Sequence, residues 1–476
     1  MYWVAGIFAV VLTACSNRYG YHRDELYFLA AGRRLDWGYA DQPPLVPLLA
    51  RVTSAIDSDS LVVLRIPAIV AAVLVVVCAG WMARELGGGR AAQTLSAGAV
   101  ASAALLLGAG HLFGTTIFDL AVWSGVTVLV LRLLRPDADS RWWLLLGVLA
   151  GIGMQNKALA ALPLLVLAVS IAVLGPREVF ATRYFPLAIG IAALLVSPYL
   201  WWQANNDWPQ WTLSRAIAGG SSGTSNSPLS FVLLQFGLMG PVLVPLWIFG
   251  LWCLWRRPRV RAFVLAYGLL FTVYLCTGGK AYYLGGMYPL LLAAGAVGLE
   301  PKLIGSRMRG AAMASVVAVN AAVSAVLFLP ILPVSELPGS PVLAINYDAG
   351  ETIGWPEFVR QIAEIRSRRA PDADILTANY GEAGAIERFG PRYGLPVPHS
   401  PHNSYWWWGP PDGSHQVIIV GVSRERVSHV CADPDLLGGI DNGLGLDNDE
   451  QGKPVVLCRA PLTPWPELWS KLRQLG

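Results

Sequence analysis

Long apolar segments recur along the first 330 residues and constrain this chain more than any other feature. A membrane-spanning helix needs roughly 20 apolar residues, and about eleven segments approach that length. They are residues 1–14, 61–83, 91–110, 113–134, 142–157, 158–174, 184–202, 229–255, 261–277, 281–299 and 310–330. Only 14% of the 476 residues are charged, against about 25% in soluble domains. The sequence therefore predicts an α-helical polytopic membrane protein with about eleven transmembrane helices.

Basic residues in the short loops predict how these segments are oriented. Lys and Arg concentrate in the cytoplasmic loops of membrane proteins, and here they fall in alternate loops. The basic loops contain Arg84, Arg90, Arg132, Arg135, Arg141, Arg177, Arg183, Arg256, Arg257, Arg259, Arg261, Lys302, Arg307 and Arg309. The other loops, and everything after residue 329, are then expected on the outer side of the plasma membrane.

The chain becomes polar after residue 330 and alternates helical and strand periodicity. An amphipathic helix is predicted at 357–369 and a closing helix at 466–475. Short strands are predicted at residues 374–378, 416–420 and 454–458. We expect a membrane domain over residues 1–335 and an extracytoplasmic α/β domain over 341–476. Its two cysteines, Cys431 and Cys458, could pair in an oxidising compartment.

The first loop, residues 15–60, concentrates ionisable side chains between two apolar segments. Asp24 and Glu25 follow the first segment directly, and apolar residues come after them at helical spacing. We therefore expect a short helix on the membrane surface, with Asp24 as the candidate catalytic carboxylate and Glu25 beside it. The alternative is structural: Asp24 caps the helix and Glu25 is a first-turn charge that suits the helix dipole.

Cationic, acidic and aromatic side chains on the expected outer side are candidates for a functional site, such as one that holds a phosphate. They are Arg18, Arg23, Asp41, Lys157, Lys280, Tyr282 and Tyr283. The first loop is basic although it is predicted outside the cytoplasm, which suggests that its arginines have another task. Lys157 interrupts an apolar stretch, where a lysine needs water or a partner. The alternatives are a turn residue for Asp41, a short outer turn for Lys157 and an interfacial lysine for Lys280.

Other polar and aromatic residues give weaker signals. His111 and Trp407 are candidates for contact with an acceptor or a sugar; Trp407 could equally dip into the lipid surface. Asp119 is expected about one turn into the membrane, facing the interior or a cavity. We assign a structural role to three histidines of the C-terminal region, His399, His402 and His415. No metal site is predicted there, because neither a carboxylate nor a cysteine lies near His399 and His402 in the sequence. A divalent metal cofactor is left open.

Two motifs resemble the GT-C superfamily of membrane glycosyltransferases, which includes protein O-mannosyltransferases and aminoarabinose transferases. The first is DELYFLAAGRRL, at residues 24–35, with its Pro-Pro-Leu closure at 43–45. The second, GKAYYLGGMYPL at 279–290, is similar to a late outer-loop segment of the family. Similar proteins also carry NYGEAGA and YWWWGPP segments, here at 379–385 and 405–411.

The resemblance implies an inverting glycosyltransferase that moves a sugar from a polyprenyl-phosphate donor to a hydroxyl acceptor outside the cell. The acceptor could be a protein, a lipid or a cell-envelope glycan, and Asp24 would be the catalytic carboxylate. Many relatives have a lysine where this chain has Gln42, so Arg18, Arg23, Lys157 or Lys280 would have to replace its charge. The alternative is a transporter or flippase for a polyprenyl-linked or amphiphilic solute. No nucleic-acid partner is predicted.

Overall fold

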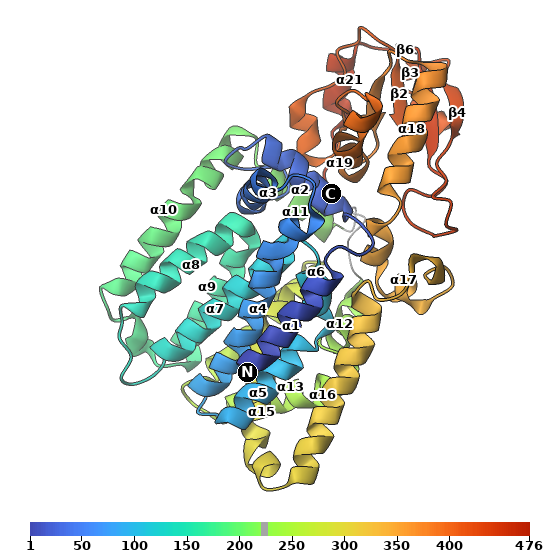
Figure 1. Ribbon diagram of the computed structural model, residues 1–476. Coiled ribbons are helices and arrows are strands. Elements are labelled where there is room, and N and C mark those ends of the chain that lie inside the picture. The colour runs from blue at the N-terminus through green and yellow to red at the C-terminus, as the bar shows by residue number, and fades with distance from the viewer. Residues whose placement is uncertain (220–226) are drawn as a thin grey trace. The chain divides into compact units, whose positions relative to one another are not determined.

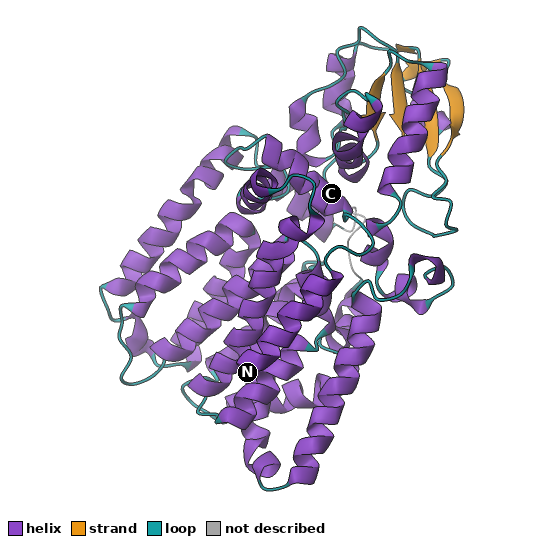
Figure 2. Ribbon diagram, in the orientation of Figure 1, coloured by secondary structure: helices purple, strands orange, loops and turns teal. Residues whose placement is uncertain are grey.

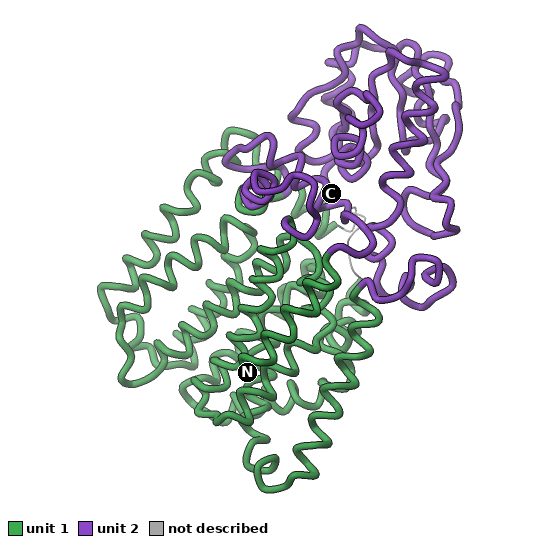
Figure 3. The backbone as a smooth tube through the Cα atoms, viewed as in Figure 1, with its two compact units in different colours: residues 1–16, 42–46, 64–329 green, residues 17–41, 47–63, 330–476 purple. Residues whose placement is uncertain are grey.

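The computed structural model describes residues 1–219 and 227–476 and divides into two compact units (Figure 3). Unit 1 comprises residues 1–16, 42–46 and 64–329. Unit 2 comprises residues 17–41, 47–63 and 330–476. Most of the first loop therefore packs with the C-terminal residues, although almost 300 residues of chain separate them.

Unit 1 is a bundle of helices, labelled in Figure 1, and each of the eleven predicted apolar segments is helical. The helices of these segments are α1 (Tyr2–Cys15), α4 (Leu61–Glu85), α5 (Arg90–Ala101), α6 (Ala104–His111), α7 (Thr115–Leu133), α8 (Trp142–Asn156), η1 (Ala158–Ala160), α9 (Ala161–Leu174), α10 (Tyr184–Asn205), α12 (Pro228–Leu238), η3 (Pro241–Leu243), α13 (Val244–Trp255), α14 (Ala262–Cys276), η4 (Ala281–Met287), α15 (Tyr288–Ile304) and α16 (Arg307–Phe328). Two further short helices are η2 (Arg177–Phe180) and α11 (Pro209–Ala218).

Fewer helices are long and apolar enough to cross a membrane than the eleven spans that the sequence predicts. Among the described residues, five helical segments are long and apolar enough to cross a membrane, and two bent pairs raise the number to seven. The pairs are α5 with α6, bent by 61°, and α12 with α13, bent by 78°. Segments 91–110 and 229–255, each predicted as one span, are therefore bent at a break. The first break follows Ser102, and the second falls at Gly240, whose φ of +95° favours glycine.

One buried asparagine satisfies backbone groups at both breaks. Asn320, on α16, donates from its side-chain nitrogen to the carbonyl of Ser102 at 2.8 Å and to that of Met239 at 3.0 Å. Where a helix is interrupted inside an apolar bundle, backbone carbonyl groups lose their helical hydrogen bonds and water does not reach them. An unpaired carbonyl in such surroundings is costly. The polar residue in an otherwise apolar helix is explained by this double contact.

Unit 2 contains every strand of the described chain (Figure 2). Its main sheet has the strand order β1-β2-β5-β4. The strands are β1 (Asp374–Thr377), β2 (Val417–Val420), β4 (Asp435–Gly439) and β5 (Pro454–Cys458); β1 and β2 are parallel and the other pairs antiparallel. A second sheet pairs β3 (Cys431–Ala432) with β6 (Ala460–Pro461). The three predicted strands are thus confirmed within a residue or two.

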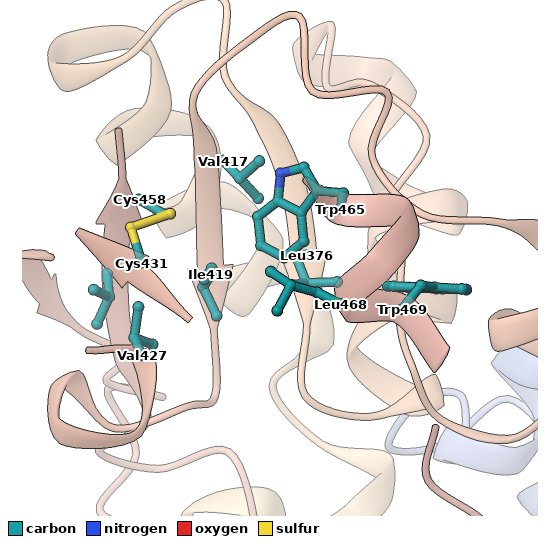
Figure 4. Close-up of a cluster of buried hydrophobic side chains, with 10 residues drawn as sticks. Leu376, Val417, Ile419, Val427, Cys431, Cys458, Trp465, Leu468 and Trp469 are labelled. Atoms are coloured by element: carbon teal, nitrogen blue, oxygen red, sulfur yellow. A yellow bond between two sulfur atoms is a disulfide. The ribbon is translucent and has the colours of Figure 1, made fainter. Parts of the chain in front are cut away.

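The core of this sheet is apolar and carries the disulfide. Figure 4 shows Trp465 and Leu468, from the closing helix α21 (Trp465–Leu472), directed at strand β2. Cys431 and Cys458 form a disulfide beside this cluster. The other helices of unit 2 are α2 (Arg23–Arg33), α3 (Leu45–Ile56), η5 (Val334–Glu336), α17 (Pro341–Ile345), η6 (Tyr347–Thr352), α18 (Trp355–Arg369), α19 (Tyr380–Phe389), η7 (Gly390–Tyr393), η8 (Asn403–Trp408) and α20 (Arg424–Val427).

Candidate functional site

Helix α2 begins with a capping box that fixes the first turn. His22 is the N-cap, and its Nδ1 accepts a hydrogen bond from the backbone N–H of Asp24 at 3.2 Å. The carboxylate of Glu25 accepts in return from the backbone N–H of His22 at 2.8 Å. Glu25 is fully buried. The N-cap therefore lies two residues before Asp24, which the structural alternative makes the cap. Asp24 is the second helical residue, and Glu25 is the acid of the capping box.

The Asp24 carboxylate is held on one side and accessible on the other. Its Oδ1 accepts a hydrogen bond from the hydroxyl of Tyr380 at 2.7 Å, and its Oδ2 lies 3.9 Å from Nδ1 of His22. The Asp24 side chain is 44% exposed. Because a base must reach the proton that it removes, this combination of one fixed oxygen and an accessible side chain suits general-base chemistry.

A second carboxylate of the first loop belongs to the same unit. Asp41 accepts from the hydroxyl of Tyr27 at 2.6 Å and from the side-chain amide of Asn403 at 3.4 Å. Burial raises the pKa of Asp41 to about 7; the Tyr27 hydrogen bond partly offsets this effect, and the negative charge of Asp24 adds to it. Asp41 is therefore a half-buried carboxyl that can change protonation near neutral pH, which turn statistics do not reveal.

The two arginines predicted to bind phosphate are engaged within unit 2. Arg23 forms ion pairs with Glu351 at 3.3 Å and with Asp449 at 2.9 Å. Arg18 donates to the carbonyl oxygen of Ile331 at 3.0 Å. The partners of both side chains lie more than 300 residues away in the sequence. These contacts give the two arginines a structural role that the sequence of the first loop does not indicate.

Four of the predicted donor-binding residues come together in unit 1. Lys157 follows α8 in extended conformation, and its Nζ lies 5.0 Å from the ring centre of Tyr282 and 4.4 Å from that of Tyr283. The Nζ of Lys280 lies 5.9 Å from the Tyr282 ring. Cations over aromatic faces are stabilised by the ring quadrupole, so two lysines converge on one pair of tyrosines.

A small pocket adjoins this cluster through Tyr283. Its lining is mostly apolar and comes from α7, α9, α14 and η4, with Asp119 as its acidic member. A Cβ on Gly286 would lie 1.9 Å from the Trp123 side chain, so only glycine lets η4 lie this close to α7. Asp119 thus faces a cavity, as its position in an apolar segment predicts.

The remaining predicted residues are dispersed. His111 is buried at the end of α6. The guanidinium carbon of Arg473 lies 4.3 Å from the ring centre of Trp407. One face of this ring is therefore covered by a cationic side chain of the protein itself. The ligand atoms of Asp374, Asp412 and His415 lie within 4.8 Å of one another. The two latter side chains are exposed, and three such groups do not define a metal centre by themselves.

Gln42 is buried with 3% exposure. Neither polar atom of its side chain has a hydrogen-bond partner within residues 1–219 and 227–476. Buried amides are nearly always paired, so the Gln42 side chain has hydrogen-bonding capacity that no described residue uses. Among the described residues, sequence reasoning missed Tyr380, Asn403 and the capping role of His22. The NYGEAGA segment was noticed, but its tyrosine was not singled out.

Comparisons with known proteins concern the family and the fold of this chain. Residues 41–202 match the family model described as dolichyl-phosphate-mannose-protein mannosyltransferase. No curated protein sequence matches the chain. ArnT from Cupriavidus metallidurans is similar in structure with a TM-score of 0.63 at 15% identity, covering 95% of this chain and 97% of ArnT.

Two other solved structures share the fold over less of their own length. Arabinofuranosyltransferase AftD from Mycobacteria gives a TM-score of 0.54 at 15% identity, over 96% of this chain and 41% of AftD. The oligosaccharyltransferase of Archaeoglobus fulgidus gives 0.50 at 12% identity, over 83% and 64%. The family model matches residues 41–202 of this chain, and solved structures of membrane glycosyltransferases share its fold. Both findings agree with the resemblance to GT-C glycosyltransferases that the two sequence motifs carry.

Proposed function

We propose that this protein transfers a sugar, with inversion, from a polyprenyl-phosphate donor to a hydroxyl acceptor on the outer face of the plasma membrane. The observation that carries the proposal is the Asp24 carboxylate. It lies in the first turn of α2, one oxygen is fixed by Tyr380, and the side chain is 44% exposed. The acceptor class is any molecule with a free hydroxyl, including protein, lipid or cell-envelope glycan.

The reaction that we assign to this carboxylate is a single displacement. The Oδ2 atom of Asp24 takes the proton of the acceptor hydroxyl while the acceptor oxygen forms a bond to the anomeric carbon. The bond from that carbon to the phosphate oxygen breaks, and the lipid phosphate leaves with the electron pair. A positioned base typically contributes about 10²–10⁴ in rate.

The leaving lipid phosphate needs positive charge and hydrogen-bond donors around it. We assign this task to Lys157 and Lys280, the two cations that converge on Tyr282 and Tyr283. The amide of Gln42, buried and unpartnered among the described residues, is a further donor. A solved structure of ArnT from Cupriavidus metallidurans contains undecaprenyl phosphate, which supports a polyprenyl-phosphate donor for this chain.

A transporter or flippase is the second candidate, because two spans are broken. Transporters use such breaks to aim helix ends at a charged solute near the membrane midplane. Here the carbonyl groups at both breaks are bonded by Asn320, a neutral side chain. The ionisable residues cluster instead around Asp24 and around Lys157. This distribution favours the enzyme.

The proposal is tested by sugar transfer in proteoliposomes with a panel of polyprenyl-phosphate sugars and hydroxyl acceptors. We expect Asp24→Asn to lower transfer by about 10² or more at unchanged expression, because asparagine keeps the size of the side chain but cannot accept the proton. Asp36→Asn, in the same loop, is the matched control and should transfer at the wild-type rate. Equal transfer by wild type and Asp24→Asn would refute the assignment.

A further inference from the structure

Tyr380 is rigidly placed at the first position of helix α19. The N-cap of this helix is Asn379, whose side chain accepts from the backbone N–H of Glu382 at 2.9 Å. The Glu382 carboxylate accepts in return from the backbone N–H of Asn379 at 3.2 Å. This second capping box fixes the backbone of the first helical turn. Because Tyr380 lies between Asn379 and Glu382, the direction of its side chain is fixed as well.

Two glycines allow α19 to lie directly against α2. A Cβ on Gly381 would lie 2.9 Å from Cβ of Arg23, and a Cβ on Gly384 would lie 2.9 Å from the backbone carbon of Leu26. Both distances are too short for any side chain. The NYGEAGA segment is therefore specified by this packing: its asparagine and glutamate cap the helix, its glycines allow the close approach, and its tyrosine reaches Asp24.

The Tyr380 ring is enclosed by three neighbours in the same unit. The guanidinium of Arg23 lies 5.3 Å from the ring centre, the Tyr27 ring 4.8 Å and the His402 ring 4.9 Å. The hydroxyl therefore has little freedom to leave Asp24. Burial and the negative charge of Asp24 raise the pKa of Tyr380 well above 10, so the hydroxyl keeps its proton and remains a donor at every physiological pH.

We propose that Tyr380 is the positioning residue of the proposed base: its hydroxyl holds Oδ1 of Asp24 so that Oδ2 is left to take the acceptor proton. This inference rests on the proposed function. It also gives the C-terminal domain a part in the chemistry, because the domain supplies the group that orients the carboxylate. The hydrogen bond stabilises the ionised carboxylate, which is the form that acts as a base.

The first test compares wild type, Tyr380→Phe and Tyr393→Phe in the transfer assay as a function of pH. Phenylalanine keeps the ring and its packing and removes only the hydroxyl. A hydrogen bond to a charged group is worth roughly 10- to 100-fold, so kcat of Tyr380→Phe should fall by about that factor with the donor KM unchanged. The acid limb of its pH–rate profile should move to higher pH. Tyr393→Phe, at an exposed tyrosine of the same domain, should match wild type.

The second test separates positioning from a general loss of stability. In an Asp24→Asn background the carboxylate is already absent, so adding Tyr380→Phe should change the residual rate by less than about twofold. The inference is overturned if Tyr380→Phe lowers the rate by the same factor in both backgrounds, or if it leaves the wild-type rate and pH profile unchanged. Full activity of Asp24→Asn alone would instead refute the proposed function, so the two failures are distinguishable.

Discussion

Arg23 offers a sharp test, because the sequence and the structure assign it different tasks. The sequence predicts a phosphate ligand, whereas the structure pairs Arg23 with Glu351, whose side chain is only 1% exposed, and with Asp449. Replacing Arg23 by Met leaves the buried Glu351 without its cation. Breaking a buried ion pair in this way costs about 3–5 kcal/mol. For a domain of 150–250 residues, that is roughly 6–20 °C in the midpoint of thermal unfolding.

The pH dependence of this loss follows from the partner. Burial raises the pKa of Glu351, and the positive charge of Arg23 partly offsets that effect. Without Arg23 the folded state holds the Glu351 proton more tightly, so the variant recovers stability as the pH falls and loses it as the pH rises. We expect the variant's unfolding midpoint to lie further below that of wild type at pH 8 than at pH 5.

The assay is thermal unfolding of the detergent-solubilised full chain, followed by tryptophan fluorescence. The double variant Arg23→Met/Glu351→Gln removes both charges and should recover most of the lost midpoint, because no buried charge is then left unpaired. The control Arg360→Met removes partly exposed ion pairs with Glu357 and Glu364 and should leave the midpoint close to wild type. An unchanged midpoint for Arg23→Met, together with a raised donor KM, would refute the reasoning and restore the phosphate-binding role.

Two further predictions concern the other charged clusters. Lys157→Met should raise the donor KM by roughly 10- to 100-fold, the value of a hydrogen bond to a charged group, while Lys302→Met should not; equal KM values in the transfer assay would exclude Lys157 from the donor site. Burial raises the pKa of both Glu382 and Glu450, which face each other, so the folded state binds protons more tightly than the unfolded state. Wild type should therefore lose stability as the pH rises above the ordinary glutamate value of 4.5, and Glu450→Gln should flatten this decline. A wild-type midpoint that rises between pH 5 and 8, with the variant parallel to it, would contradict this linkage.

Local patterns predict most of the secondary structure. The strands at 374–377, 417–420 and 454–458 are short apolar runs, and the helices of unit 1 coincide with the apolar segments. The two bends are not predictable in the same way, because hydropathy continues across Ser102 and Gly240 without interruption. The second bend has a local turn signal, Gly240-Pro241, whereas the shared partner Asn320 on α16 becomes visible only in the structure.

The candidate site is predicted only in part, because its partners are distant in the sequence. Asp24 stands out through its motif, but Tyr380 lies 356 residues away and has no signal that marks it as a neighbour. The ion pair of Arg23 with Glu351 spans 328 residues, so an excess of positive charge in the first loop was read as a binding site. Lys157 stands out because a lysine in apolar surroundings needs a partner, and Lys280, Tyr282 and Tyr283 stand out through their motif. The structure brings these four side chains together, and their role in donor binding stays a prediction.

The most direct test of the central claim is to measure, by mass spectrometry, the polyprenyl phosphate released for each sugar transferred in proteoliposomes. The account predicts one lipid phosphate for each glycosylated acceptor with the wild-type protein, and almost none of either product with Asp24→Asn. Movement of the intact sugar lipid across the bilayer, with no released lipid phosphate and no effect of Asp24→Asn, would contradict the account and identify a flippase instead.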